Sequence, residues 1–177
     1  TKIPPLGNAS DYKQSIKKGL ELSMKNLGCT IDVLFFHDPA DSTLLLEYPD
    51  FFEKLIRENL DSTLGVSVYE PKEIEKLLGC GFELAYQFPF NVLDRRFEKV
   101  KMPVGKRNAR SIFLQGLLAF ENGLRPGAPP ELIQLQKDYH SLVNKHGLDP
   151  VDVAVSFVND SECADFFLVG VDTEKQL

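Results

Sequence analysis

The sequence predicts an α/β fold in which helices cover a parallel β-sheet, and two observations support this prediction. Short apolar runs with few charges alternate along the chain with longer segments that carry apolar residues at helical spacing. The short runs, such as Ile31–Phe36, are apolar at most successive positions, which is typical of strands buried on both faces of a sheet. The pattern fits an open doubly wound sheet and a barrel segment equally well. No break in composition divides residues 1–177, so we expect a single domain.

The first half of the chain is predicted to alternate between helix and strand. Ser10 can cap a helix that ends near Leu27, because Gly28 stands where a C-terminal glycine is expected. The apolar face of this helix comprises Tyr12, Ile16, Leu20, Met24 and Leu27. The elements expected next are a strand at 31–36, a helix at 51–58, a strand at 64–68, a short helix from Pro71 to about Gly79, a strand at 83–87 and a helical turn at 91–97.

The second half continues the same alternation. A loop rich in proline and glycine at 125–130 separates a strand from the strongest late helix. The elements expected here are a strand at 110–114, a helix at 131–146, a helix opened by Asp149 and Pro150, a strand at 166–169 and a helix that starts at Asp172 or Thr173.

Composition and charge argue against several classes of function. The net charge is −6, and no apolar run approaches the roughly 20 residues of a membrane helix, so we expect neither a nucleic-acid nor a membrane partner. The first residues lack the apolar core of a signal peptide.

The three cysteines are far apart and form no CxxC pair, which favours a reducing cytoplasm: Cys29, Cys80 and Cys163. The three histidines show no zinc-site spacing, so no metal is expected: His37, His140 and His146.

One histidine stands at the tip of a predicted strand. His37 follows Phe35 and Phe36 directly, and chemistry in α/β folds gathers at the carboxyl ends of parallel strands. Taken alone, this position fits a solvated surface histidine equally well. No GxGxxG or GxxxxGK[ST] motif follows any predicted strand, which lowers the odds of a Rossmann or P-loop protein.

Several short runs together carry a more specific signal through their order and spacing. They are Leu27-Gly28 with Ile31-Asp32-Val33-Leu34, then Gly65-Val66-Ser67, Gln87-Phe88-Pro89-Phe90-Asn91-Val92-Leu93-Asp94-Arg95, Arg110-Ser111-Ile112-Phe113-Leu114-Gln115-Gly116-Leu117-Leu118, and Val169-Gly170-Val171-Asp172-Thr173 with Gln176-Leu177. In this order the set resembles the aldo-keto reductase family. The resemblance implies a (β/α)8 TIM barrel that is incomplete here, holding about strands 3 to 8. Residues 1–177 would form one barrel domain without its N-terminal strands and final helix.

The resemblance also implies an activity and two catalytic residues. Family members transfer a hydride between a nicotinamide cofactor and the carbonyl of an aldehyde, ketone or sugar. Lys2, in a Thr-Lys-Ile-Pro context, matches the family's lysine, and His37 matches its histidine. The ammonium of Lys2 would lower the pKa of a catalytic tyrosine, and His37 would donate a hydrogen bond to the substrate oxygen. The family's aspartate and tyrosine would lie upstream of Lys2.

Cofactor contacts follow from the same resemblance, with NADP as the usual cofactor and NAD also possible. Ser67 and Gln87 would hold the nicotinamide carboxamide, whereas Val68 stands where many members have asparagine. Arg110 replaces an aromatic residue that stacks on the nicotinamide; a guanidinium can stack too, or pair with a phosphate or an anionic substrate. The pyrophosphate would meet Ser111, Phe113, Gln115 and Gly116, and the adenosine end would meet Gly170, Val171, Asp172, Thr173 and Gln176.

Three functions remain open at this point. The first is an NAD(P)-dependent reductase acting on a small carbonyl or alcohol, which the presence of both Lys2 and His37 favours. The second is an inactive nucleotide-binding or regulatory subunit, which the departures at Val68 and Arg110 favour. The third is a non-redox barrel enzyme, because fold alone does not determine function. The charged run Asp94-Arg95-Arg96 is expected to form an ion-pair group in a loop, with a direct substrate role as the alternative.

Overall fold

A computed structural model describes residues 1–7, 11–171, 173 and 174 of the chain. These residues form two compact units. The first unit consists of Thr1–Phe88 and Lys99–Arg107, and the second consists of Pro89–Glu98 and the described part of Asn108–Leu177.

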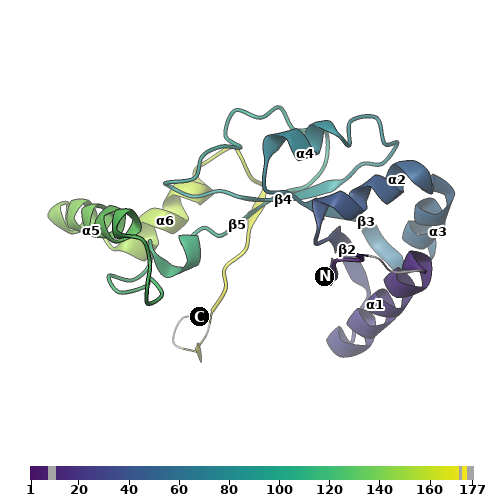
Figure 1. The fold of residues 1–177 in the computed structure, drawn as a ribbon, viewed down its shortest axis with the longest axis horizontal. Helices are drawn as coiled ribbons and strands as arrows, with labels where there is room; N and C mark the ends of the chain where they lie inside the picture. Colours follow the sequence, from purple (N-terminus) through teal and green to yellow (C-terminus); the bar gives the residue numbers. More distant parts are fainter. Residues whose placement is uncertain (8–10, 172, 175–177) are drawn as a thin grey trace. The chain divides into compact units, whose positions relative to one another are not determined.

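The first unit carries a parallel sheet whose strands pair in chain order. Its strands are β1 (Lys2–Ile3), β2 (Ile31–Phe36), β3 (Leu60–Ser67) and β4 (Ala85–Pro89), the last of which runs on into the second unit. Between them lie α1 (Tyr12–Leu27), the 3₁₀ helix η1 (Pro39–Thr43), α2 (Leu44–Glu47), α3 (Pro49–Asn59) and α4 (Pro71–Glu75). Figure 1 shows α1 and α3 beside β2 and β3. The predicted alternation of strand and helix is confirmed here.

The face of this sheet that the helices cover forms the core of the first unit. Ile3, Phe36, Val66 and Tyr86 occupy one row across the four strands, and all of them are buried. The ring of Phe36 packs edge-on against Phe52 of α3, with the ring centroids 5.6 Å apart. Because side chains alternate along a strand, the residues before and after this row point to the opposite face.

Helix α1 begins one residue later than the sequence predicts. Its N-cap is Asp11, whose carboxylate accepts a hydrogen bond from the amide of Gln14 at 2.9 Å, whereas Ser10 lies outside the described residues. The helix ends at Gly28, which adopts a left-handed φ of 68°. The predicted apolar face does not reach Leu27, whose side chain is 60% exposed in the last turn.

The second unit joins a short parallel pair of strands to two helices. Its elements are β5 (Arg107–Arg110, which starts in the first unit), the 3₁₀ helix η2 (Leu114–Gly116), α5 (Pro130–Lys145), α6 (Pro150–Asn159) and β6 (Phe166–Phe167). Strands β5 and β6 pair in parallel through Ala109 and Phe167. Helices α5 and α6 lie side by side (Figure 1). They enclose an apolar cluster made of Leu117, Leu118, Tyr139, Val143 and Ala154.

Two predicted elements are wrong, and backbone geometry explains both. The strand expected at 110–114 instead occupies Arg107–Arg110, because Ser111 turns the chain out of the sheet with a φ of 58°. The helical turn expected at 91–97 does not form. There the side-chain oxygen of Asn91 accepts hydrogen bonds from the amides of Leu93 and Asp94, so it competes with the helical bonding pattern.

Two further observations concern the chain as a whole. Across the part that the structure describes, no helix is both long enough and apolar enough to cross a membrane. The helix expected at Asp172 or Thr173 cannot be compared with the structure, because Asp172 and residues 175–177 lie outside the described residues.

Candidate active site

The register of the parallel sheet places four predicted site residues on one face. Lys2 pairs with Phe35, Phe35 with Gly65, and Gly65 with Ala85, so these residues share a row. Two residues further along β3 and β4, the side chains of Ser67 and Gln87 point to the same face, and the alternation along β2 assigns His37, one residue past the end of that strand, to it as well. These four residues therefore share one face near the carboxyl ends of β1 to β4.

His37 continues the ladder between β1 and β2 although it follows the last residue of β2. Its amide donates a hydrogen bond to the carbonyl of Ile3 at 3.3 Å. This bond fixes the backbone at the strand tip, while the imidazole itself is exposed. An exposed imidazole at this edge can reach a bound molecule.

Lys2 reaches across a neighbouring strand to Ser67. Its ammonium (Nζ) donates a hydrogen bond to the hydroxyl oxygen (Oγ) of Ser67 at 3.3 Å, although β2 separates β1 from β3. Ser67 is fully buried, whereas Lys2 is half-buried. The contact points the lysine side chain along the carboxyl edge of the sheet, towards the buried polar residues of β3 and β4.

An apolar floor made of Phe35, Gly65 and Ala85 lies in the row of Lys2, one row below Ser67 and Gln87. A β-carbon added at Gly65 would stand 2.5 Å from the ring of Phe35 and 2.9 Å from the carbonyl oxygen of Ala85. The ring of Phe35 therefore occupies the space that a side chain at residue 65 would need. An apolar floor lowers the local dielectric constant and strengthens the electrostatic effect of the nearby ammonium.

Two buried polar side chains stand next to each other at the end of β3 and β4. Ser67 and Gln87 are paired in register, and Gln87 is only 3% exposed. The adjacent Val68 is fully buried, and its amide donates to the carbonyl of Gln87 at 2.8 Å. The side chain of Val68 offers no hydrogen bond, so Ser67 and Gln87 are the polar side chains that these strand ends contribute.

In the second unit, the predicted pyrophosphate residues lie in a strained segment that follows β5. We call residues 111–123 the β5 loop. Ser111, Leu114 and Gln115 have φ values of 58°, 44° and 55°, a left-handed conformation that non-glycine residues rarely adopt. Such strain persists only where the surroundings enforce it, and it concentrates at functional sites.

The β5 loop is held closed by two glycines. A β-carbon added at Gly123 would stand 2.1 Å from the carbonyl oxygen of Gly116, so a side chain at residue 123 has no room. Gly116 itself has a left-handed φ of 94°. Of the other predicted residues, Phe113 is half-buried against the apolar cluster of the second unit and Gln115 is exposed.

Arg110 marks the point where β5 meets the loop. Its side chain is half-buried, and Nη1 donates to the hydroxyl of Ser111 at 3.4 Å. Of the residues assigned to the adenosine end, Gly170, Val171 and Thr173 are exposed after β6. Asp172 and Gln176 lie outside the described residues.

The role of one buried residue, Asn91, was not predicted from the sequence. Its side chain is fully buried, and Nδ2 donates to the carbonyl of left-handed Ser111 at 3.0 Å. Its oxygen caps the amides of Leu93 and Asp94, so Asn91 ties the start of the β5 loop to a second segment of the same unit. An asparagine shortly after an apolar strand is the sequence signal from which such a turn could have been predicted.

The charged run at 94–96 forms ion pairs, as predicted. Arg96 donates to the carboxylate of Asp94 at 2.8 Å, and Arg95 pairs with Glu98. The guanidinium of Arg95 also lies 5.4 Å from the centroid of the Phe157 ring.

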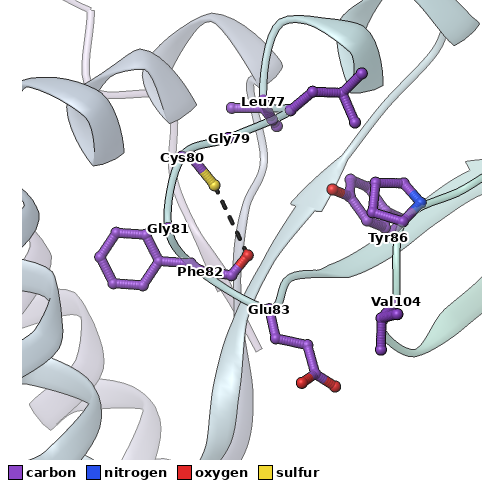
Figure 2. A pocket seen from close by; sticks show the side chains of 10 residues that line it. Leu77, Gly79, Cys80, Gly81, Phe82, Glu83, Tyr86 and Val104 are labelled. Atoms are coloured by element: carbon purple, nitrogen blue, oxygen red, sulfur yellow. Dashed lines mark hydrogen bonds between the residues drawn. The ribbon is translucent and has the colours of Figure 1, made fainter.

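A cavity of about 340 Å³ lies elsewhere in the first unit (Figure 2). It is lined by Leu77, Leu78, Gly79, Cys80, Gly81, Phe82, Glu83, Tyr86, Pro103 and Val104. Tyr86 precedes Gln87 on β4, so its side chain points to the opposite face of the sheet. Burial, with a smaller contribution from Cys80, raises the pKa of Tyr86 to about 12. The cavity therefore does not belong to the candidate active site.

Within the described ranges, no group of three or more histidine, cysteine, aspartate and glutamate residues is placed to hold a metal ion. Lys2, His37, Ser67 and Gln87 instead form a set of hydrogen-bond donors and acceptors, which suits an organic ligand.

Comparison with known proteins identifies the family of the chain. A model of the aldo/keto reductase family matches residues 1–177. Among solved structures, the holo form of aldo-keto reductase AKR11C1 from Bacillus halodurans matches with a TM-score of 0.66 and 20% identity, over 93% of this chain and 59% of that one. The apo form of the same protein matches with a TM-score of 0.70 and 19% identity, over 97% of this chain and 65% of that one. No curated protein matches the chain.

These matches confirm the predicted fold class. The parallel α/β arrangement corresponds to the (β/α)8 barrel of aldo-keto reductases, and the chain spans 59% and 65% of the length of the two structures. At this identity the structural likeness establishes the fold alone.

Proposed function

Because the chain belongs to the aldo/keto reductase family, we propose that it is part of an oxidoreductase. This enzyme transfers a hydride between NADP or NAD and the carbonyl of an aldehyde, ketone or sugar. The observation that carries this proposal is the shared face of Lys2, His37, Ser67 and Gln87 at the carboxyl edge of the sheet. The reaction needs an ammonium, a hydrogen-bond donor to oxygen and a place for a carboxamide, and this face supplies all three.

The proposed roles of Lys2 and His37 follow from the charge that the reaction creates. A bound nicotinamide supplies the hydride, and the carbonyl oxygen then becomes negative and must be stabilised. The imidazole of His37 donates a hydrogen bond to that oxygen. The ammonium of Lys2 favours the ionised form of a nearby hydroxyl and lowers its pKa, which brings a phenol closer to useful acid–base strength at neutral pH. The family resemblance assigns the proton itself to a tyrosine upstream of Lys2.

The donor set of Ser67 and Gln87 fits a nicotinamide carboxamide. An ammonium can only donate, so in the bond to Lys2 the hydroxyl oxygen of Ser67 is the acceptor. The hydroxyl hydrogen of Ser67 is then directed to another acceptor, such as a carboxamide oxygen. The amide of Gln87 can both donate and accept, and burial makes each such bond count more than it would in water.

The β5 loop is the proposed pyrophosphate contact in the second unit. Phe113, with φ −97° and ψ 7°, is followed by left-handed Leu114, and this pairing of conformations occurs in backbone concavities that bind anions in other proteins. Ser111, Gln115 and Gly116 belong to the same turn, and Arg110 can stack on the nicotinamide or pair with a phosphate. The adenosine end is proposed to be surrounded by Gly170, Val171, Asp172, Thr173 and Gln176.

We place the reaction in the cytoplasm, in keeping with three cysteines that form no CxxC pair.

The function is tested with the full-length protein by following the oxidation of NADPH and NADH with a panel of aldehydes, ketones and aldoses. The proposal predicts that NADPH or NADH is oxidised only when a carbonyl is present, and that the kcat of this reaction falls at least about 100-fold in Lys2→Met.

An inactive nucleotide-binding subunit is the second candidate, because Val68 and Arg110 depart from the family pattern. Nucleotide binding without oxidation of either cofactor by any carbonyl would favour that candidate and contradict the first.

A further inference from the structure

Helix α5 carries three polar residues on one face that all reach the β5 loop. Gln136, His140 and Asn144 are spaced by four residues, so they stand above one another on the helix. Gln136 is 4% exposed and His140 is 3% exposed, although both side chains are polar. This stripe lies within the second unit, as does the loop that it contacts.

The stripe binds backbone carbonyls of the loop directly. The side-chain amide of Gln136 donates to the carbonyls of Phe120 at 2.7 Å and Leu117 at 3.3 Å. Nε2 of His140 lies 3.0 Å from the same carbonyl of Leu117. One turn further, Asn144 donates to the carboxylate of Glu121 at 3.3 Å.

The bond to Leu117 determines where the proton of His140 lies. A carbonyl can only accept, so in this bond Nε2 carries the hydrogen and is the donor. Nδ1 is buried without a hydrogen-bond partner in the described part of the chain. Leaving a buried polar atom unsatisfied is unfavourable, and an apolar residue at this position would avoid that cost. The donation from Nε2 to Leu117 is the interaction that explains a histidine here.

The carbonyl of Leu117 directly follows the strained part of the loop. Leu114, Gln115 and Gly116 are left-handed, and Leu117 is the next residue. The amide of Leu118 donates back to the carbonyl of Phe113 at 3.1 Å, which closes the turn around these residues. A strained turn keeps its shape only if its surroundings hold it, and α5 supplies two donors at its exit.

We propose that Gln136 and His140 are positioning residues for cofactor binding: from α5 they hold the carbonyl of Leu117 and keep the β5 loop in its phosphate-binding conformation. The inference rests on the proposed function, which makes this loop the pyrophosphate contact. Neither residue touches the cofactor. Their loss weakens binding of the dinucleotide and raises the KM for it, while kcat at saturating cofactor changes little.

Helix α5 also provides a matched control for this test. Gln134 is two residues before Gln136, but it is exposed and its amide donates to the carboxylate of Asp138 at 2.7 Å. Gln136→Met and Gln134→Met therefore make the same chemical change on one helix, inside and outside the contact with the loop. His140→Gln keeps a side-chain N–H donor at this position, whereas His140→Phe removes it.

The experiment measures the Kd of NADP⁺ and NAD⁺ for the full-length protein by calorimetry, together with amide hydrogen exchange of residues 111–123. The proposal predicts a Kd about tenfold higher in Gln136→Met and His140→Phe, faster exchange in the loop, and values near wild type in Gln134→Met. Weaker binding of the dinucleotide in His140→Phe than in His140→Gln would add support.

Two outcomes would contradict the inference. If the Kd of the dinucleotide were equal in Gln136→Met and Gln134→Met while the wild-type protein binds it, the positioning role alone would be overturned. A wild-type protein that binds neither dinucleotide would overturn the proposed function, and this inference with it.

Discussion

The ammonium of Lys2 donates a hydrogen bond to the hydroxyl of Ser67 across the intervening strand β2, at 3.3 Å. This contact links the residue proposed to tune proton transfer with a residue proposed to hold the nicotinamide. The two proposed functions of the first unit therefore depend on the same side-chain geometry, and a change at either residue is expected to affect both.

Replacing Lys2 with methionine keeps much of the side-chain length but removes the charge. We expect kcat to fall at least about 100-fold, because the ammonium no longer favours the ionised form of the catalytic hydroxyl. Steady-state kinetics measure the fall. Lys106→Met is the matched control, since Lys106 pairs with Asp32 at 3.0 Å near the amino end of β2, away from the carboxyl edge. Equal kcat values for the two variants would contradict the role of Lys2.

Replacing Gly65 with alanine tests the apolar floor. The added β-carbon would stand 2.5 Å from the ring of Phe35, so we expect a loss of about 1–3 kcal/mol in the free energy of unfolding through overpacking. Chemical denaturation measures this loss, and Gly65→Ala combined with Phe35→Leu should recover part of it. Gly19→Ala in α1 has space and should be stabilising by up to about 1 kcal/mol. If Gly65→Ala were as stable as wild type, the packing of Phe35 over residue 65 would be wrong.

Asp172 is expected to influence the choice between NADPH and NADH. A carboxylate repels a 2′-phosphate and can accept a hydrogen bond from a free 2′-hydroxyl. Asp172→Arg should therefore raise the affinity for NADPH relative to NADH, as measured by titration of both cofactors. Unchanged relative affinities would show that residue 172 does not contact the ribose.

Tyr86 is expected to titrate late, because burial raises its pKa from 10.0 to about 12. A group whose folded-state pKa is raised stabilises the fold fully below its unfolded pKa, and this contribution is lost as the pH rises through the folded-state value. The contribution of Tyr86 is therefore complete below pH 10 and is lost between about pH 10 and 12. The free energy of unfolding should fall less steeply over this range in Tyr86→Phe than in wild type. Parallel pH profiles would contradict the shift.

Much of the fold could be predicted from the sequence because apolar runs and helical spacing are local signals. The run at 31–36 forms β2 with the same bounds, and the helix expected at 131–146 is observed as Pro130–Lys145. The run at 112–114 is equally apolar, yet its residues do not extend β5, because Ser111 adopts a left-handed φ. Local composition does not reveal this backbone reversal, which Asn91 holds from a different segment.

The candidate residues of the first unit and the stripe on α5 differed in how far the sequence predicted them. The positions of Lys2 and His37 on neighbouring strands followed from strand order and from the family resemblance, and the register of β1 and β2 agrees with them. The polar stripe of α5 was not predicted. Polar residues at four-residue spacing usually mark a solvent-facing side of a helix, and only tertiary contacts show that Gln136 and His140 bind buried carbonyls.

The central claim is that hydride passes directly from a nicotinamide to a substrate carbonyl, and isotope transfer tests it most directly. The full-length protein is supplied with NADPH or NADH carrying deuterium at the transferable C4 position and with a carbonyl substrate that it reduces. Mass spectrometry of the alcohol should show deuterium on the former carbonyl carbon, and His37→Gln should slow its appearance. An alcohol without deuterium, or full turnover in Lys2→Met, would contradict the account.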